Sequence, residues 1–185
     1  MKTPLILGRL VGFLSLLLAF MPVSATIELR AKRLTTADGL ANNSIRYMHQ
    51  DSKGFIWIAT LNGLNRYDGN SFVTFRPEET VELSLADHRV RTIQEDKNGF
   101  LWITTSADLI SCYDLRHDRF VDFTGCGEYR EPYREAVILE DAIWLWGTVR
   151  GCRRITNEGG VFASEAFTVD NGKLPSNKIR FVRHW

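Results

Sequence analysis

Arginines at corresponding positions are the side chains of this sequence best suited to binding chemistry. They occur in the pairs Ile45-Arg46, Val90-Arg91 and Ile179-Arg180. A guanidinium offers five donors in a planar fork, which suits sugar hydroxyls and carboxylates. We expect these arginines either to border a ligand site or to brace the fold by pairing with acidic residues of a neighbouring repeat, such as Glu95 and Glu140. The candidate binding residues are Arg46, Arg91, Arg180, Asn62 and Arg150.

Residue types that catalyse reactions or hold metals do not form working sets. The four histidines lack the paired spacing of a zinc site or of a base beside a nucleophile. The run Asp51-Ser52-Lys53-Gly54 lacks the alternating oxygen ligands that calcium requires and is expected to be a turn. Glu140 and Asp141 are adjacent in an expected strand, so they face opposite sides and are poorly placed for joint acid–base work. We expect no catalytic residue, metal or cofactor.

The arginine pairs recur because the sequence itself repeats. Residues 44–60 match residues 89–105, and the tryptophan of the first copy, Trp57, returns 45 residues later as Trp102. A degraded third copy surrounds Trp144 with a shortened turn, and a fourth begins near Asn177. The residues that we assign to the repeat framework are Asp51, Gly54, Trp57, Thr60, Gly63, Asp96, Gly99, Trp102, Thr105, Trp144 and Thr148.

Each repeat contains short β-rich runs separated by turn residues. Four strands in a period of about 40 to 45 residues are typical of a propeller blade. The middle runs, Phe55–Ile58 and Phe100–Ile103, are apolar on both faces, as expected for strands enclosed between neighbouring sheets. The three repeat tryptophans should therefore pack between blades. We predict an all-β fold of four-stranded antiparallel propeller blades, with about three blades and the start of a fourth forming an incomplete ring.

The first 25 residues have the features of an export signal. Lys2 and Arg9 precede the apolar run Leu10–Phe20, and Val23-Ser24-Ala25 supplies small residues for cleavage. The expected organisation is a helical signal peptide over 1–25, a lead-in strand over 26–36, repeats over 37–80, 81–125 and 126–170, and the start of a fourth repeat over 171–185.

The charge balance limits the classes of partner. The formal net charge is +1, and the basic residues are interspersed with acidic ones. Because there is no basic stripe, we expect no contact with nucleic acid or with an anionic membrane surface.

The motif Asp-x-x-Gly-Phe-x-Trp-Ile-x-Thr, followed by the run from Gly63 to Asp68, resembles the two-component regulator propeller repeat. That repeat occurs in the periplasmic sensor regions of hybrid two-component system histidine kinases, chiefly from Bacteroidetes. The resemblance extends from about Ile27 to the end. It departs in the second copy, where Asp108-Leu109 replaces Gly63-Leu64 and one residue is added, and in the third copy, which lacks the Asp-x-x-Gly turn.

The resemblance implies an N-terminal segment of a larger sensor. Intact relatives have two propellers, a β-sandwich, a transmembrane helix, a histidine kinase and usually a receiver with a DNA-binding region. They sense oligosaccharides and regulate polysaccharide utilisation. We therefore expect an oligosaccharide ligand, the remaining blades and a homodimer as partners, a periplasmic location, and membrane contact only through a downstream helix. This chain shows no phosphoacceptor box or ATP lid, so we expect no enzyme activity from it.

Other functions remain open on the sequence. An extracellular propeller enzyme, either a lyase or a glycoside hydrolase, would use the same fold, as would a protein-interaction propeller or a non-functional truncated remnant. An enzyme should place carboxylates or histidines in the turns at one end of several blades. An unclosed ring also leaves a sheet face uncovered, so we expect the isolated chain to be marginally stable or to associate.

Overall fold

The computed structural model describes residues 31–80, 83–123, 133–140, 142–147 and 150–180. The chain divides into two compact units, Met1–Arg33 and Leu34–Trp185, and every described strand lies in the second. The expected signal peptide over 1–25 lies outside the described residues. Within these residues, no helix is long and apolar enough to cross a membrane.

The lead-in strand expected over 26–36 is wrong for its described part. Residues 31–35 have no regular structure, and a 3₁₀ helix, η1 (Thr36–Asp38), follows. The Thr35 hydroxyl accepts a hydrogen bond from the Ala37 amide, and the Asp38 carboxylate accepts one from the Thr35 amide at 2.8 Å. This capping pair closes the chain into a helical turn and so prevents an extended strand.

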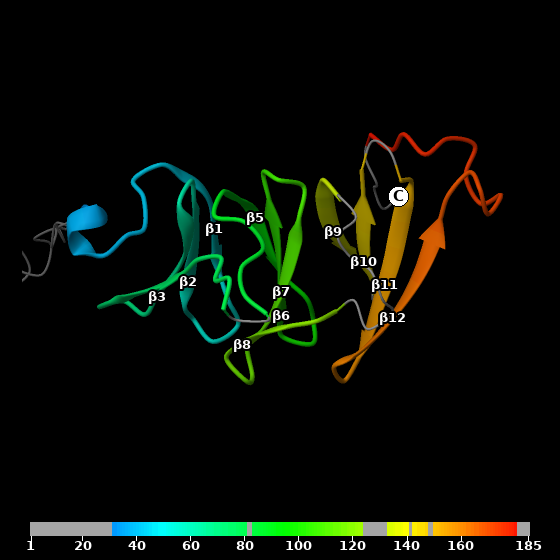
Figure 1. Ribbon diagram of the computed structural model, residues 1–185. Coiled ribbons are helices and arrows are strands. Elements are labelled where there is room, and N and C mark those ends of the chain that lie inside the picture. The colour runs from blue at the N-terminus through cyan, green and yellow to red at the C-terminus, as the bar shows by residue number, and fades with distance from the viewer. Residues whose placement is uncertain (1–30, 81–82, 124–132, 141, 148–149, 181–185) are drawn as a thin grey trace, which may run out of the picture. The chain divides into compact units, whose positions relative to one another are not determined.

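Three antiparallel sheets of four strands form the described part of the second unit, and Figure 1 shows them in succession along the colour ramp. In each sheet the strands follow chain order, so every sheet is built from consecutive hairpins. This confirms the predicted all-β fold of four-stranded blades. Blade 1 contains β1 (Ile45–Gln50), β2 (Ile56–Thr60), β3 (Gly63–Tyr67) and β4 (Phe72–Phe75). Blade 2 contains β5 (Val90–Glu95), β6 (Phe100–Thr105), β7 (Ile110–Asp114) and β8 (Arg119–Val121). Blade 3 contains β9 (Glu135–Leu139), β10 (Ala142–Trp146), β11 (Cys152–Glu158) and β12 (Val161–Phe167).

Strand β6 is buried on both faces because it lies between two cores. Its residues Leu101 and Ile103 pack with Trp57 of blade 1 in one cluster. The alternate residues, Phe100 and Trp102, pack with blade 3 in a second cluster. Successive side chains of a strand point to opposite faces, so one strand supplies apolar surface to both neighbouring blades.

The Asp-x-x-Gly turn and the tryptophan of each clear repeat form one hydrogen-bonded unit. In blade 2, Asp96 Oδ1 accepts from the amides of Asn98 at 2.9 Å and Phe100 at 3.0 Å. Its Oδ2 accepts from the indole Nε1 of Trp102 at 3.0 Å. Asp51 repeats all three bonds in blade 1, where its Oδ2 lies 2.7 Å from the indole nitrogen of Trp57. One carboxylate thus shapes the turn and satisfies a buried donor.

A polar link joins the outer parts of blades 1 and 2. Asp118 has a φ of 55° in the turn before β8, and its carboxylate accepts from the Tyr113 hydroxyl at 2.6 Å and from the Arg66 guanidinium of β3. The hydrogen bond from Arg66, with that from Tyr113, holds the pKa of Asp118 below its usual value. Burial, together with Asp118, raises the pKa of Tyr113. The tyrosine therefore remains a hydrogen-bond donor.

Candidate ligand-binding site

The turns between the second and third strands of each blade, and the segments that lead into the inner strands, lie at one end of the sheets. We call this end the rim. The Gly63 amide donates to the His88 carbonyl at 2.6 Å, and the Gly151 amide donates to the Asn177 carbonyl at 3.0 Å. A Cβ at Gly63 would lie 2.9 Å from the Phe75 carbonyl oxygen, so the close packing of the Gly63 backbone on Phe75 requires glycine. The Asn177 carbonyl thus accepts a hydrogen bond from blade 3 at the position where the His88 carbonyl accepts one from blade 1.

Two of the expected binding arginines lie at irregularities in the inner strands. The β1–β2 register shifts between Ile45 and Tyr47, and the β5–β6 register shifts between Val90 and Thr92. In each strand the residue without a partner on the neighbouring strand is the repeat arginine, Arg46 in β1 and Arg91 in β5. An extra residue of this kind changes the direction of its side chain and is frequent beside binding sites.

Arg91 braces blades 2 and 3. Its Nη1 donates to the Arg134 carbonyl at 2.6 Å and to Glu135 Oε1 at 3.2 Å, both at the start of β9. Its Nη2 donates to Asp108 Oδ1 at 3.0 Å. Asp108 has a φ of 59° in the β6–β7 turn. Arg91 therefore braces the fold by pairing with acidic residues, but these are Asp108 and Glu135 and not the expected Glu95 and Glu140.

The partner Asp108 exists because the turn of blade 2 is one residue longer than that of blade 1. In blade 1, Gly63 pairs with Thr60 across the β2–β3 turn, and the Thr60 hydroxyl donates to the Gly63 carbonyl at 2.8 Å. In blade 2 the Thr105 hydroxyl makes the same bond to Leu109 at 3.0 Å. Leu109 thus replaces Gly63, and Asp108 is the inserted residue. The insertion supplies the carboxylate that holds Arg91.

A cavity of about 310 Å³ opens at the rim of blade 3. We call it the rim cavity, and its lining residues are Arg134, Glu135, Trp146, Gly147, Ile179 and Arg180. The Ile179 amide donates to the Gly147 carbonyl at 3.3 Å, which holds the segment before Arg180 against the end of β10. Arg180 is exposed and makes no hydrogen bond or ion pair with the described part of the chain. Its guanidinium donors are therefore open to a ligand.

The acidic side chain of the rim cavity is held by arginines. Glu135 is half-buried, accepts from Arg91 Nη1, and lies 3.9 Å from Arg134 Nε. The Arg134 side chain is exposed apart from this contact. Because Glu135 is already paired, the charged groups that the cavity presents to a ligand are mainly donors, and Trp146, which is 8% exposed, forms part of the wall.

The other expected binding residues do not join this cavity. Arg46 is exposed on β1 and has no hydrogen bond or ion pair within the residues that the structure describes. Asn62 is exposed in the β2–β3 turn, and its carbonyl accepts from Arg76 Nε at 3.3 Å. Arg150 is exposed in the turn before β11. Thr148, expected in the repeat framework, lies outside the described residues.

Comparison with known proteins identifies the repeats. A family model described as the two-component regulator propeller matches residues 39–62 and 84–107. Two stretches of this chain, one for blade 1 and one for blade 2, thus match the two-component regulator propeller repeat. Both matched stretches run from the segment before an inner strand to the following β2–β3 or β6–β7 turn, and they include the Asp-x-x-Gly turn and the tryptophan.

Solved structures show the same fold. The extracellular domain of a hybrid two-component system from B. thetaiotaomicron is 22% identical with a TM-score of 0.59, over 80% of this chain and 21% of that chain. The extracellular domain of a one-component system from the same organism is 24% identical with a TM-score of 0.51, over 73% of this chain and 17% of that chain. Histidine kinase P4 of Formosa agariphila is 38% identical over 55 residues, which are 29% of this chain and 4% of that protein. The chain thus spans only a small part of each relative.

The structure also fixes the register of the third repeat, in blade 3. Trp102 pairs with Gln94 across blade 2, and Trp144 pairs with Val137 across blade 3. Val137 therefore corresponds to Gln94, so β9 is displaced from β5 by 43 residues and not by the 45 that separate the first two copies. With this register the residue that corresponds to Arg91 is Arg134. The repeat arginine is present in blade 3 and lines the rim cavity.

Sequence reasoning missed Arg134, Glu135 and Trp146. An alignment anchored on Trp144, with the gap confined to the β9–β10 turn, would have found Arg134. Glu135 and Trp146 face each other in adjacent strands, but no repeated pattern marks them as cavity residues.

Proposed function

We propose that this chain is part of the ligand-sensing propeller of an extracytoplasmic two-component sensor and that the rim cavity binds an oligosaccharide. The two-component regulator propeller repeats support the sensor role, and the extracellular relatives support the location. The observation that carries the proposal is the rim cavity itself, which Arg134, Arg180 and Trp146 line together.

The chemistry of the rim cavity suits a sugar. Guanidinium groups donate to hydroxyl and carboxylate oxygens, and an indole offers an apolar face to the C–H groups of a sugar ring. Arg91 supports the arrangement by fixing Glu135 and the Arg134 carbonyl at the start of β9. The cavity wall is therefore built before a ligand arrives, which lowers the entropic cost of binding.

A glycosidase or lyase is a weaker alternative. Glycoside hydrolysis uses a pair of carboxylates on either side of the scissile bond. Among the described residues that line the rim cavity, Glu135 is the single carboxylate, and it is already paired with Arg91. These contacts favour recognition over catalysis.

The proposal places this chain at the input end of a longer signalling protein. In this view it lies on the periplasmic side of the inner membrane, and further blades complete the propeller. A downstream helix and histidine kinase carry the signal in a homodimer, and the response controls polysaccharide-utilisation genes. Ligand binding at the rim would favour one packing of the blades over another, which is the differential binding that a switch requires.

The test is a binding screen with a matched pair of variants. The intact sensor region is applied to an array of immobilised oligosaccharides, and the affinity of each hit is measured by isothermal titration calorimetry. Arg180→Gln should weaken binding by about tenfold or more, because it removes charged hydrogen bonds. Lys178→Gln is the control, because Lys178 is exposed nearby but does not line the cavity.

Two results would count against the proposal. One is a hit whose affinity is the same for wild type, Arg180→Gln and Arg134→Gln. The other is the absence of any oligosaccharide hit by a folded sensor region.

A further inference from the structure

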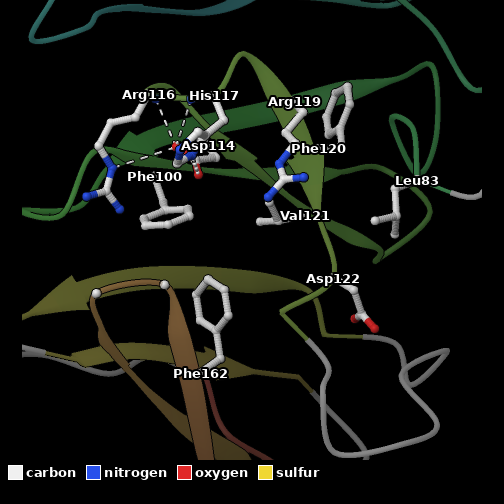
Figure 2. A pocket seen from close by; sticks show the side chains of 12 residues that line it. Leu83, Phe100, Asp114, Arg116, His117, Arg119, Phe120, Val121, Asp122 and Phe162 are labelled. Carbon is white, nitrogen blue, oxygen red and sulfur yellow. Dashed lines mark hydrogen bonds and ion pairs between the residues drawn. The ribbon is translucent and has the colours of Figure 1, made fainter.

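A second cavity lies at the opposite end of the blades from the rim. It has a volume of about 400 Å³ and lies between the β7–β8 turn of blade 2 and the β11–β12 turn of blade 3. We call it the outer cleft. Figure 2 shows its wall of basic side chains, Arg116, His117 and Arg119, facing Phe162 of blade 3. None of its residues lines the rim cavity.

Arg119 is the open donor of the outer cleft. Its side chain is exposed, and it makes no hydrogen bond or ion pair with the residues that the structure describes. In Figure 2 its guanidinium projects from β8 into the space between Phe100 and Asp122. A planar group with five donors at this point can bind a carboxylate or a sulfate through two parallel hydrogen bonds.

His117 is oriented by a buried carboxylate. Its Nδ1 lies 2.7 Å from Asp114 Oδ2, and Asp114 Oδ1 accepts from the Arg116 amide at 2.8 Å. Burial opposes ionisation of Asp114, but the hydrogen bonds from His117 and from the backbone outweigh it and lower its pKa. The Asp114 carboxylate therefore has its hydrogen-bond partners within the turn. The second ring nitrogen of His117 is left as a donor or acceptor for a ligand.

The side chain of Arg116, the second arginine of the cleft, packs on the ring of Phe100. The Arg116 guanidinium carbon lies 5.5 Å from the centre of the Phe100 ring, and its Nε is 3.9 Å from Asp114. Phe162 meets Phe100 edge to face with 5.4 Å between ring centres. These contacts give the cleft an apolar wall beside its donors, a combination that suits a ring with one charged substituent.

We propose that the outer cleft binds an acidic sugar, a pyranose that carries a carboxylate or a sulfate ester. The anionic group lies on Arg119 and His117, and the ring lies against the apolar wall that includes Phe162. This site is separate from the rim cavity and does not depend on the function proposed for it.

The test uses the purified intact sensor region and three monosaccharide probes. D-glucuronate, D-glucose 6-sulfate and neutral D-glucose are titrated, and their affinities are measured by isothermal titration calorimetry. The expected result is binding of both acidic sugars, and binding of glucose that is about tenfold weaker or more. The tighter of the two acidic probes identifies the preferred anionic group.

Variants separate the site from general charge effects. Arg119→Gln should weaken the acidic probes about tenfold and preserve the fold, since Arg119 has no partner among the described residues. Arg89→Gln is the control, because Arg89 is an exposed arginine of blade 2 that does not line the cleft. Equal affinities of wild type and Arg119→Gln would overturn the proposal. So would glucose binding as tightly as the acidic sugars, or inorganic sulfate binding as tightly as glucose 6-sulfate.

Discussion

Single carboxylates couple a surface turn to the core in the first two blades. Asp51 and Asp96 are each almost fully buried although they lie in hairpin turns. Each accepts two backbone amides of its own turn and the indole N–H of the following tryptophan. A buried tryptophan without a partner for its N–H would lose the hydrogen bond that it makes with water in the unfolded chain. The aspartate of the repeat is therefore a packing residue as much as a turn residue.

Removal of this carboxylate should be costly. Asp96→Ala leaves three donors without an acceptor, one of them the buried indole of Trp102, so we expect a loss of about 3 kcal/mol in the free energy of unfolding. Urea unfolding followed by tryptophan fluorescence measures it. Asp68→Ala is the matched control, because Asp68 accepts the Asn70 and Ser71 amides in an exposed turn without an indole. A loss for Asp68→Ala as large as that for Asp96→Ala would contradict the role of the indole bond.

The binding residues show where the sequence was informative. The apolar-Arg pairs drew attention to Arg46, Arg91 and Arg180, and of these three Arg180 lines the rim cavity. The partners of these arginines could not be read from the sequence. Asp108 holds Arg91 only because an inserted residue adopts a left-handed conformation, and Glu135 meets Arg91 only through the packing of two blades. Such contacts depend on tertiary structure.

Among the elements, the hairpins were predictable and their exact register was not. In blade 1 the four short strands were predictable, because turn residues such as Asp68 and Gly69 lie directly between the apolar runs. In blade 3 the β9–β10 turn is short, with Leu139 paired to Ala142 and Glu140 at a φ of 53°. No local signal shows on which side of such a turn residues are missing relative to the first two copies, so the sequence alone does not fix the register of β9.

The rim turns should tolerate substitution less than the turns at the opposite end. Gly63 and Gly54 both have a positive φ, 120° and 90°, so alanine costs about 1 kcal/mol of backbone strain at either position. At Gly63 the added Cβ would also lie 2.9 Å from the Phe75 carbonyl oxygen, whereas nothing lies within 4 Å at Gly54. We expect Gly63→Ala to lower the free energy of unfolding by at least about 2 kcal/mol, and Gly54→Ala by about half as much.

Thermal and urea unfolding of the two alanine variants provide the measurement. Because the Gly63 amide also donates to the His88 carbonyl, the Gly63→Ala variant should show faster amide exchange in the segment before β5. If Gly63→Ala and Gly54→Ala lost the same stability, and amide exchange in the segment before β5 did not change, the contact between Gly63 and the Phe75 carbonyl would contribute nothing to stability.

In the second unit each blade depends on its neighbour for burial. Val90 and Ile93 of β5 are both 0% exposed because they pack against blade 1. The corresponding residues of β1, displaced by 45 positions, are Ile45 and Met48, and they are 46% and 56% exposed. The same positions are thus covered in blade 2 and uncovered in blade 1. A blade that precedes blade 1 in a complete propeller would cover them.

The isolated chain should therefore associate through the uncovered face of β1. We expect residues 26–185 to show concentration-dependent sedimentation, because an apolar sheet face and strand edge favour self-association. Met48→Lys should shift the distribution toward monomer, since a charged side chain on this face is costly to bury. Val161→Lys is the control, because Val161 is 74% exposed on β12, outside the β1 face, and should leave the distribution unchanged. If wild type were monomeric at all concentrations and melted cooperatively above ordinary mesophilic temperatures, the three blades would be self-sufficient and the β1 face would need no neighbour.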